Sequence, residues 1–223
     1  MGEAALRHQR GFSLIGIMTG LLISTLAALS ALSLYRTLVV RSVESGQRAN
    51  QDGHLAAGTL GAQMELQGAG FGIGTLATPA AANTDLIVLA DATLDASGHL
   101  GGSVRPLTAS TQASGNAIVW AANPTLASIE CSALLASNGG LKLLRSACGA
   151  ATQWSTLNWQ TASELIPPGG VSASGATLRA ERSSCWPFGQ AGANSQAIKL
   201  TLWDDASAWK SSVCLPNVKA PST

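Results

Sequence analysis

The sequence predicts an α+β fold, in which a long N-terminal helix packs on a mostly antiparallel β-sheet. Two observations indicate the helix: no charged residue occurs from Phe12 through Tyr35, and apolar residues then recur at helical spacing as far as Gln67. A third indicates the sheet, because after Gln67 the apolar runs are short and lie between clusters of Gly, Pro, Ser and Asn. We therefore expect one long helix followed by a β-rich domain over residues 68–223.

The uncharged stretch, residues 12–35, is long enough to cross a membrane. A helix of about 20 residues spans the roughly 30 Å hydrocarbon core of a bilayer, and this stretch exceeds that length. Its polar residues are Ser and Thr, whose hydroxyls can hydrogen-bond to the preceding helical turn. Arg7 and Arg10 precede the stretch, so the positive-inside rule places residues 1–11 in the cytoplasm and the residues after Arg36 across the membrane.

Two interpretations of this stretch follow from hydropathy alone. A secretory signal peptide has a shorter apolar region and then a small-residue cleavage site. Here the apolar run is too long, and no clean A-x-A site closes it before Tyr35. An uncleaved signal anchor fits the hydropathy and stays open as the simpler interpretation.

The junction at the start of the stretch resembles the signal of type IV prepilins. From Arg10 to Gly16 it reads R-G-F-S-L-I-G, a basic residue and a Gly-Phe step that open a long apolar helix. The resemblance implies that a prepilin peptidase removes residues 1–11 as a leader peptide by cutting between Gly11 and Phe12, and that it methylates the new N-terminus of Phe12. It also implies that residues 12–35 are kept, as a transmembrane helix and then as part of a filament core.

The same resemblance implies a pilin-like fold without a cofactor. Its implied partners are the prepilin peptidase, the inner-membrane assembly platform, and other minor and major pilins. Its implied location is a single pass through the bacterial inner membrane with a periplasmic C-terminus, followed by the pilus fibre at the cell surface.

Gly16 departs from the pattern of that family. Prepilins usually carry Glu as the fifth residue after the cut, where it neutralises the terminal amine of a neighbouring subunit in the filament. A lone charge in hydrocarbon is costly, so this pairing has a clear physical basis. The minor subunit that caps the tip of related secretion pseudopili also lacks this Glu. The departure therefore predicts a place at or near the tip of a filament.

Residues 36–67 read as an amphipathic continuation of the helix. We expect one apolar stripe to pack on the following domain, formed by Leu38, Val39, Val43, Ala49, Leu55, Ala56, Leu60 and Met64. Four glycines lie in the same segment, and each weakens a helix by up to about 1 kcal/mol, which makes bending or local melting plausible near Gly46, Gly53, Gly58 and Gly61.

The glycine-rich segment G-A-G-F-G-I-G, Gly68 to Gly74, is expected to end the helix. Its spacing is similar to a dinucleotide-binding fingerprint, but that fingerprint follows a strand and opens a helix, whereas these glycines close one. Residues 63–72 and 83–89 also resemble the helix-to-loop junction and first strand of the W class of minor pilins, in which a G-[YF]-G-like segment precedes a strand that opens on Asp, here Asp85.

Five apolar or β-branched runs are expected to form strands: Leu86–Ala90, Ala117–Ala121, Leu141–Leu144, Thr177–Ala180 and Ala197–Trp203. Most of them are too close in sequence for crossover helices, so we expect antiparallel pairing. Pro167 to Gly170 is the best candidate for a linker, but a loop is the simpler interpretation.

All four cysteines follow the apolar stretch, which predicts two disulfides in an exported domain. Three connectivities are possible; we favour the sequential pairs, Cys131–Cys148 and Cys185–Cys214, because each closes a local loop. The six Trp are unusual beside one Tyr and three Phe. Core packing and interaction hot spots are the two interpretations of those in or near the cysteine-containing half, with core packing favoured: Trp154, Trp159, Trp186 and Trp209.

Composition argues against several function classes. The formal net charge of +1 and 11% charged residues give no overall electrostatic case for a nucleic-acid binder. No catalytic or nucleotide-binding motif is present around the three histidines, His8, His54 and His99, so we do not expect an enzyme. Two acidic spots were weighed as calcium sites, but both lack the spacing of a calcium loop and solvated turns are favoured: Asp91 with Asp95, and Asp204 with Asp205.

These observations predict a minor pilin-type structural subunit that takes part in assembly or initiation of a type IV pilus. A minor pseudopilin of a type II secretion system is one alternative, and a tip adhesin or DNA-uptake module is another. The hypotheses thus fall into three classes: a structural subunit, a binding module, and an anchored periplasmic enzyme. The junction at Gly11 and Phe12 favours the structural subunit.

Overall fold

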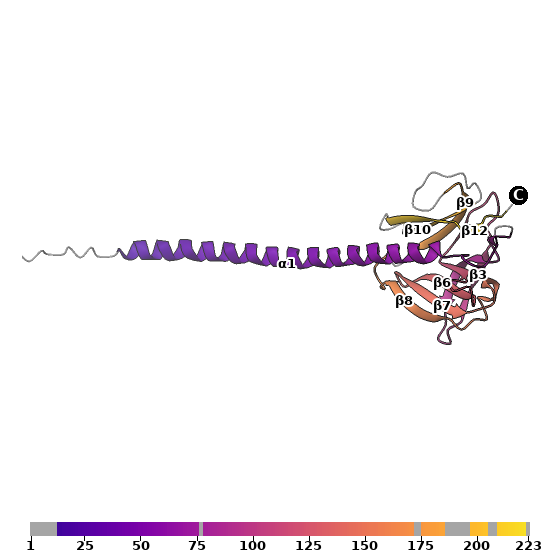
Figure 1. Cartoon of the computed structure of the whole chain (residues 1–223). Coiled ribbons are helices and arrows are strands. Elements are labelled where there is room, and N and C mark those ends of the chain that lie inside the picture. The colour runs from indigo at the N-terminus through magenta and orange to yellow at the C-terminus, as the bar shows by residue number, and fades with distance from the viewer. Residues whose placement is uncertain (1–12, 76–77, 172–174, 186–196, 205–208, 222–223) are drawn as a thin grey trace, which may run out of the picture. The chain divides into compact units, whose positions relative to one another are not determined.

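The computed structural model describes residues 13–75, 78–171, 175–185, 197–204 and 209–221. The chain divides into two compact units, Met1–Asn50 and Gln51–Thr223. Helix α1, Leu14–Gln67, supplies the described part of the first unit and continues into the second (Figure 1). Antiparallel sheets with two disulfides form the rest of the second unit, so the α+β class predicted from the sequence is confirmed.

Helix α1 covers both segments that the sequence predicts to be helical, and none of its four later glycines interrupts it. It ends at Gln67, as predicted. The next two N–H groups, of Gly68 and Ala69, donate to the carbonyls of Glu65 (3.1 Å) and Leu66 (3.0 Å), which tightens the last turn. The left-handed conformation falls on Gly70, with φ of 76°, where the chain turns toward the first strand.

The larger sheet has six antiparallel strands in the order β3-β2-β5-β6-β7-β8. Their bounds are β2 (Leu86–Leu94), β3 (Leu100–Arg105), β5 (Ala117–Ala122), β6 (Glu130–Ser137), β7 (Gly140–Ala147) and β8 (Gln160–Ile166). Between β7 and β8 lies a short 3-10 helix, η1 (Ala151–Gln153).

The second sheet has four antiparallel strands in the order β11-β10-β9-β4: β4 (Ala113–Gly115), β9 (Thr177–Ser183), β10 (Ala197–Asp204) and β11 (Trp209–Leu215). A short parallel ribbon pairs β1 (Ala80–Ala81) with β12 (Val218–Lys219). Each of the five predicted strands lies in an observed one, namely β2, β5, β7, β9 and β10. The turn at Pro167 to Gly170 connects the two sheets within one unit, so its interpretation as a loop is confirmed.

Two apolar clusters stabilise the second unit. The first lies between the sheets and includes Leu66 of α1, Leu134 of β6 and Leu200 of β10. Figure 1 shows the last turns of α1 between β9 and β10 on one side and β6 to β8 on the other. The second cluster covers the opposite face of the larger sheet, where η1 and Trp159 pack over the strands. Strands β2, β5 and β6 are thus buried on both faces, which explains why their apolar runs do not alternate.

The apolar stripe predicted for residues 36–67 is wrong in its details. Leu60 and Met64 are 57% and 65% exposed, whereas the buried face of α1 consists of Gly58, Ala62 and Leu66. Helix and sheet approach so closely that a Cβ on Gly58 would overlap the backbone carbonyl of Leu165 in β8. Small residues therefore form the closest contact, and of the predicted stripe Leu55 alone packs partly buried against the core. The predicted members Leu38, Val39, Val43, Ala49 and Ala56 are exposed as well.

Candidate functional site

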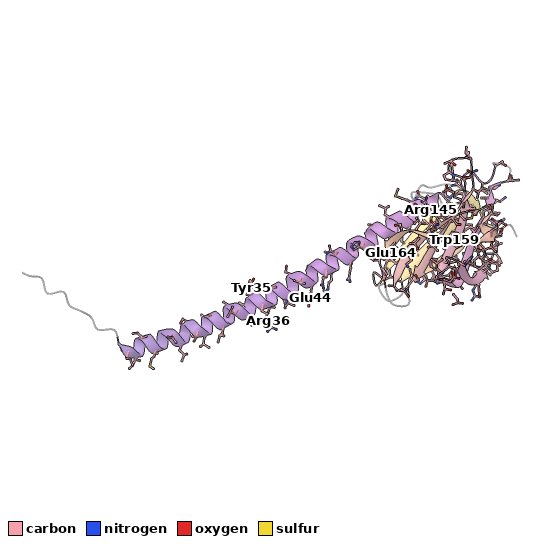
Figure 2. The ribbon with its side chains drawn as sticks, turned by 90° about the horizontal axis from the view of Figure 1, so that it is seen from below. Tyr35, Arg36, Glu44, Arg145, Trp159 and Glu164 are labelled. Atoms are coloured by element: carbon pink, nitrogen blue, oxygen red, sulfur yellow. A yellow bond between two sulfur atoms is a disulfide. The ribbon has the colours of Figure 1, made fainter. Side chains whose placement is uncertain are left out.

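The first candidate site is the N-terminal part of α1, up to Tyr35. In the part of the chain that the structure describes, α1 is the one helix long and apolar enough to cross a membrane. Up to Tyr35, its large apolar side chains are all more than half exposed. Figure 2 shows where the uncharged stretch ends, at Tyr35 and Arg36, with Glu44 further along the helix. The helix thus presents an apolar surface that is compatible with membrane anchoring.

Four of the six hydroxyl side chains of this stretch donate to carbonyls of the same helix. Thr19 donates to the carbonyl of Ile15 (3.0 Å) and Thr25 to that of Leu22 (2.9 Å). Ser24 and Ser30 donate in the same way to Leu21 (3.0 Å) and Leu26 (2.9 Å). In hydrocarbon every polar group needs an internal partner, and these back-bonds meet that condition.

The predicted cleavage and methylation residues, Gly11 and Phe12, lie outside the described residues. The helix begins directly after them, and the carbonyl of Ser13 accepts the N–H of Gly16 at 2.9 Å. A Cβ added at Gly16 or at Gly20 would have nothing within 4 Å. Packing inside this chain therefore does not require glycine at either position.

Polar contacts hold the C-terminal turns of α1 against the sheets of the second unit. Arg145 of β7 binds both carboxylate oxygens of Glu65 at 2.9 Å, and Arg145 is labelled in Figure 2. Gln63 donates to the hydroxyl of Ser211 in β11 at 2.7 Å. Both bonds come from one nitrogen, Nη2 of Arg145, and the pair is partly exposed, so it contributes little energy.

The two disulfides join the pairs predicted from the sequence, Cys131–Cys148 and Cys185–Cys214, each with a Cα–Cα distance of 5.7 Å. The first ties β6 to the segment after β7, and the second ties the segment after β9 to β11. Core packing is confirmed for Trp159, which is 2% exposed and donates from Nε1 to the carbonyl of Trp154 at 2.8 Å. Trp154 and Trp209 pack partly buried against the two clusters. Trp186 lies outside the described residues.

We expect the chain isolated from cells to contain no free thiol, because both pairs have disulfide geometry and close loops within one domain. Alkylation without prior reduction, followed by mass spectrometry, is expected to give no adduct on any cysteine. The same treatment after reduction is the positive control and is expected to label all four cysteines. Two or more labelled cysteines in unreduced material, or a peptide joining Cys131 to Cys185, would contradict this expectation.

Of the acidic residues considered as calcium ligands, Asp95 has structural partners, whereas Asp91 is exposed in β2. Oδ1 of Asp95 accepts the N–H groups of Ser97 and His99 at 2.8 Å each, in the turn between β2 and β3. These bonds, that of His99 first, lower the pKa of Asp95 below its ordinary value. Asp204 is buried at the end of β10, and Asp205 lies outside the described residues. Among the described residues, no three His, Cys, Asp or Glu side chains come together.

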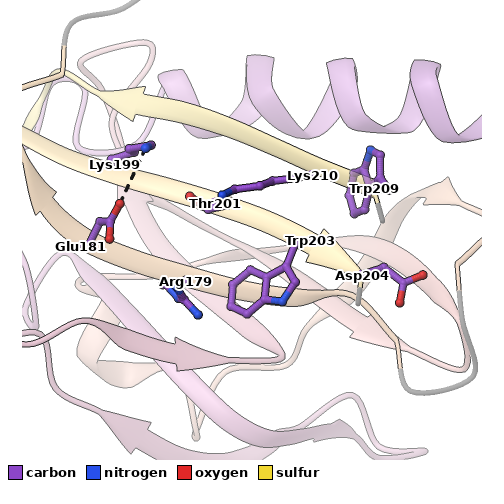
Figure 3. Close-up of a pocket in the computed structure, with 8 residues that line it drawn as sticks. All are labelled: Arg179, Glu181, Lys199, Thr201, Trp203, Asp204, Trp209 and Lys210. Carbon is purple, nitrogen blue, oxygen red and sulfur yellow. Dashed lines mark ion pairs between the residues drawn. The ribbon is translucent and has the colours of Figure 1, made fainter. Parts of the chain in front are cut away.

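The structure adds a second site that the sequence analysis did not identify. On the outer face of β9, β10 and β11, a groove of about 340 Å³ is lined by charged side chains and Trp (Figure 3). In β9 the side chains alternate, with Leu178 and Ala180 in the core and Arg179 and Glu181 outside. That alternation was visible in the sequence, but the partners across the sheet were not.

Comparison of the chain with protein-family models, with curated proteins and with solved structures gives no match. The functional assignment therefore depends on the residues of the first candidate site and their chemistry.

Proposed function

We propose that this chain is a minor pilin-type structural subunit that takes part in assembly or initiation of a type IV pilus, at or near its tip. The observation that carries the proposal is the helix that begins just after the Gly11–Phe12 step and carries no charge before Arg36. Its internally bonded hydroxyls support the same role, because they let the helix exist first in lipid and then among other helices.

In this proposal the helix is the assembly element. Moving from lipid into a filament changes little in apolar burial, so association between such helices depends on close packing rather than on the hydrophobic effect. Gly16, Gly20, Ser24 and Ala28 follow one another at four-residue spacing and therefore share one face of α1. Small residues at this spacing let two helix backbones approach closely, which gives the subunit a face for a neighbouring helix.

The β-rich unit has a different role in the proposal. It would be exported to the periplasm, where disulfides form, and it would contact other minor and major pilins. The prepilin peptidase and the inner-membrane assembly platform would act on residues 1–35, in the bacterial inner membrane, before the subunit enters the fibre at the cell surface.

Processing is the direct test of this proposal. Membrane-extracted protein from a host with a prepilin peptidase is expected to have an intact mass that begins at a methylated Phe12. Gly11→Ala is expected to be cut more completely than Gly11→Leu, because the peptidase needs a small residue before the cut. A peptidase-deficient host supplies the control and is expected to retain residues 1–11. A chain that keeps its leader in the peptidase-positive host would instead be an uncleaved anchor.

A further inference from the structure

The outer face of β9, β10 and β11 has the features of a ligand site. A groove there is lined by eight residues (Figure 3), and we name this set the outer-face groove: Arg179, Glu181, Lys199, Thr201, Trp203, Asp204, Trp209 and Lys210. Its shape comes from strand register: Lys199 pairs with Glu181, Thr201 with Arg179, and Trp203 with Lys210. Three cations, two carboxylates and two indoles line this groove.

Arg179 is the pre-organised element of the groove. Its guanidinium carbon lies 4.4 Å from the centroid of the Trp203 ring, a cation–π stack. Its Nε is buried and has no hydrogen-bond partner in the part of the chain that the structure describes. A buried donor without a partner is costly, and native structures leave few of them. A guanidinium held flat by an indole presents a fixed fork of donors, which matches a carboxylate or phosphate.

The two lysines of the groove, Lys199 and Lys210, make few strong contacts with other described residues. Lys199 lies 3.7 Å from Glu181, and both side chains are more than a third exposed, so this pair contributes little. Lys210 forms no ion pair with another described residue. The lining therefore carries three cations against two carboxylates, Glu181 and Asp204.

The hydrogen-bond donors and acceptors of the groove favour one class of anionic ligand over another. A phosphodiester backbone offers acceptors for Arg and Lys but no hydrogen-bond donor for the carboxylate of Glu181. Sugar hydroxyls both donate and accept, so they suit Glu181, Thr201 and the lysines together.

We propose that the outer-face groove binds an acidic saccharide, a sugar chain that bears carboxylates, with a carboxylate on Arg179 and a hydroxyl on Glu181. The proposal commits to this occupant on charge complementarity, and it does not depend on filament assembly. It adds a recognition surface to a subunit for which we otherwise propose a structural role.

The test uses the full chain in detergent micelles and an oligogalacturonate as the probe, measured by titration calorimetry. The expected result is saturable binding that is weakened about tenfold or more by Arg179→Gln and by Lys199→Gln, because each removes a charge-assisted hydrogen bond. Arg179→Lys is expected to weaken binding too, since it keeps the charge but loses the fork. The fully methyl-esterified oligomer, which lacks the carboxylates, is expected to bind at least tenfold more weakly.

Lys142→Gln is the matched control. Lys142 pairs with Glu164 across β7 and β8 at 3.6 Å, the same kind of contact as Lys199 with Glu181 but on the other sheet. The Lys142→Gln variant is therefore expected to bind the oligogalacturonate as the wild-type chain does. Each variant is first checked for the wild-type near-ultraviolet circular dichroism spectrum, and Trp203→Phe, which keeps an aromatic ring, replaces any Arg179 variant that does not fold.

Three results would overturn the proposal. The first is no binding of the oligogalacturonate by the wild-type chain. The second is equal weakening by Lys199→Gln and Lys142→Gln. The third is tighter binding of a single-stranded oligonucleotide, with the steep salt dependence that phosphate contacts produce, which would make the groove a nucleic-acid site.

Discussion

Replacing Gly58 by alanine is expected to destabilise the chain by about 1–3 kcal/mol, as overpacking of a close contact does. The added Cβ would overlap the Leu165 carbonyl and come within 2.6 Å of Cγ1 of Ile166. Neither neighbour is the free end of a flexible side chain, because Leu165 contributes backbone and Ile166 is 1% exposed. Helix α1 would have to move away from β8, and that movement would loosen the cluster around Ala62 and Leu66.

Gly53→Ala is the matched control for this substitution. Gly53 lies in the same helix, but a Cβ there would meet nothing within 4 Å, so better helix propensity is expected to stabilise the chain by up to about 1 kcal/mol. Urea denaturation of the full chain in mild detergent, followed by tryptophan fluorescence, measures both. If Gly58→Ala proves as stable as Gly53→Ala, the close approach of α1 to β8 is wrong.

The Gly58 contact also shows why the fold was only partly predictable. The sequence predicted the end of the helix and the strands β2, β5, β7, β9 and β10, because these segments carry their own local signals. It did not predict the other strands, among them β3, β6, β8 and β11. Strand β6, for example, lacks β-branched residues and is a strand because it is buried between β5 and β7. The packing stripe failed for a similar reason: hydropathy favoured Leu60 and Met64, whereas the distance between helix and sheet selected Gly58 and Ala62.

The two candidate sites also differ in how far the sequence could predict them. The Gly11–Phe12 step is a local sequence signal, and it lies outside the described residues, so the sequence alone carries it. The outer-face groove is the reverse case, because Arg179 and Trp203 are 24 positions apart and meet only through the register of β9 with β10. Register depends on the whole sheet, and no spacing along the chain encodes it.

Gly16 leads to the prediction with the largest effect on function. If the missing carboxylate keeps the subunit out of the filament shaft, wild-type protein is expected at low copy number near the tip. Gly16→Glu would restore a partner for the terminal amine of the next subunit, which removes the cost of an isolated charge in a low-dielectric setting. The variant is therefore expected to enter the shaft at several times the wild-type level, measured by quantitative mass spectrometry and immunogold labelling of sheared filaments.

Two control variants separate the lost charge from the small-residue face of α1. Gly20→Glu places the same carboxylate about one helical turn further into the apolar stretch, away from any terminal amine, and a side chain there has open space within the chain. Gly20→Glu is expected to reduce incorporation, because its charge would be unpaired.

Gly16→Ala keeps a small residue and adds no charge, so it is expected to leave copy number unchanged. If Gly16→Ala raises incorporation as much as Gly16→Glu, helix packing rather than the carboxylate sets the position. If labelling finds wild-type protein along whole filaments at levels near the major subunit, the placement at the tip is wrong.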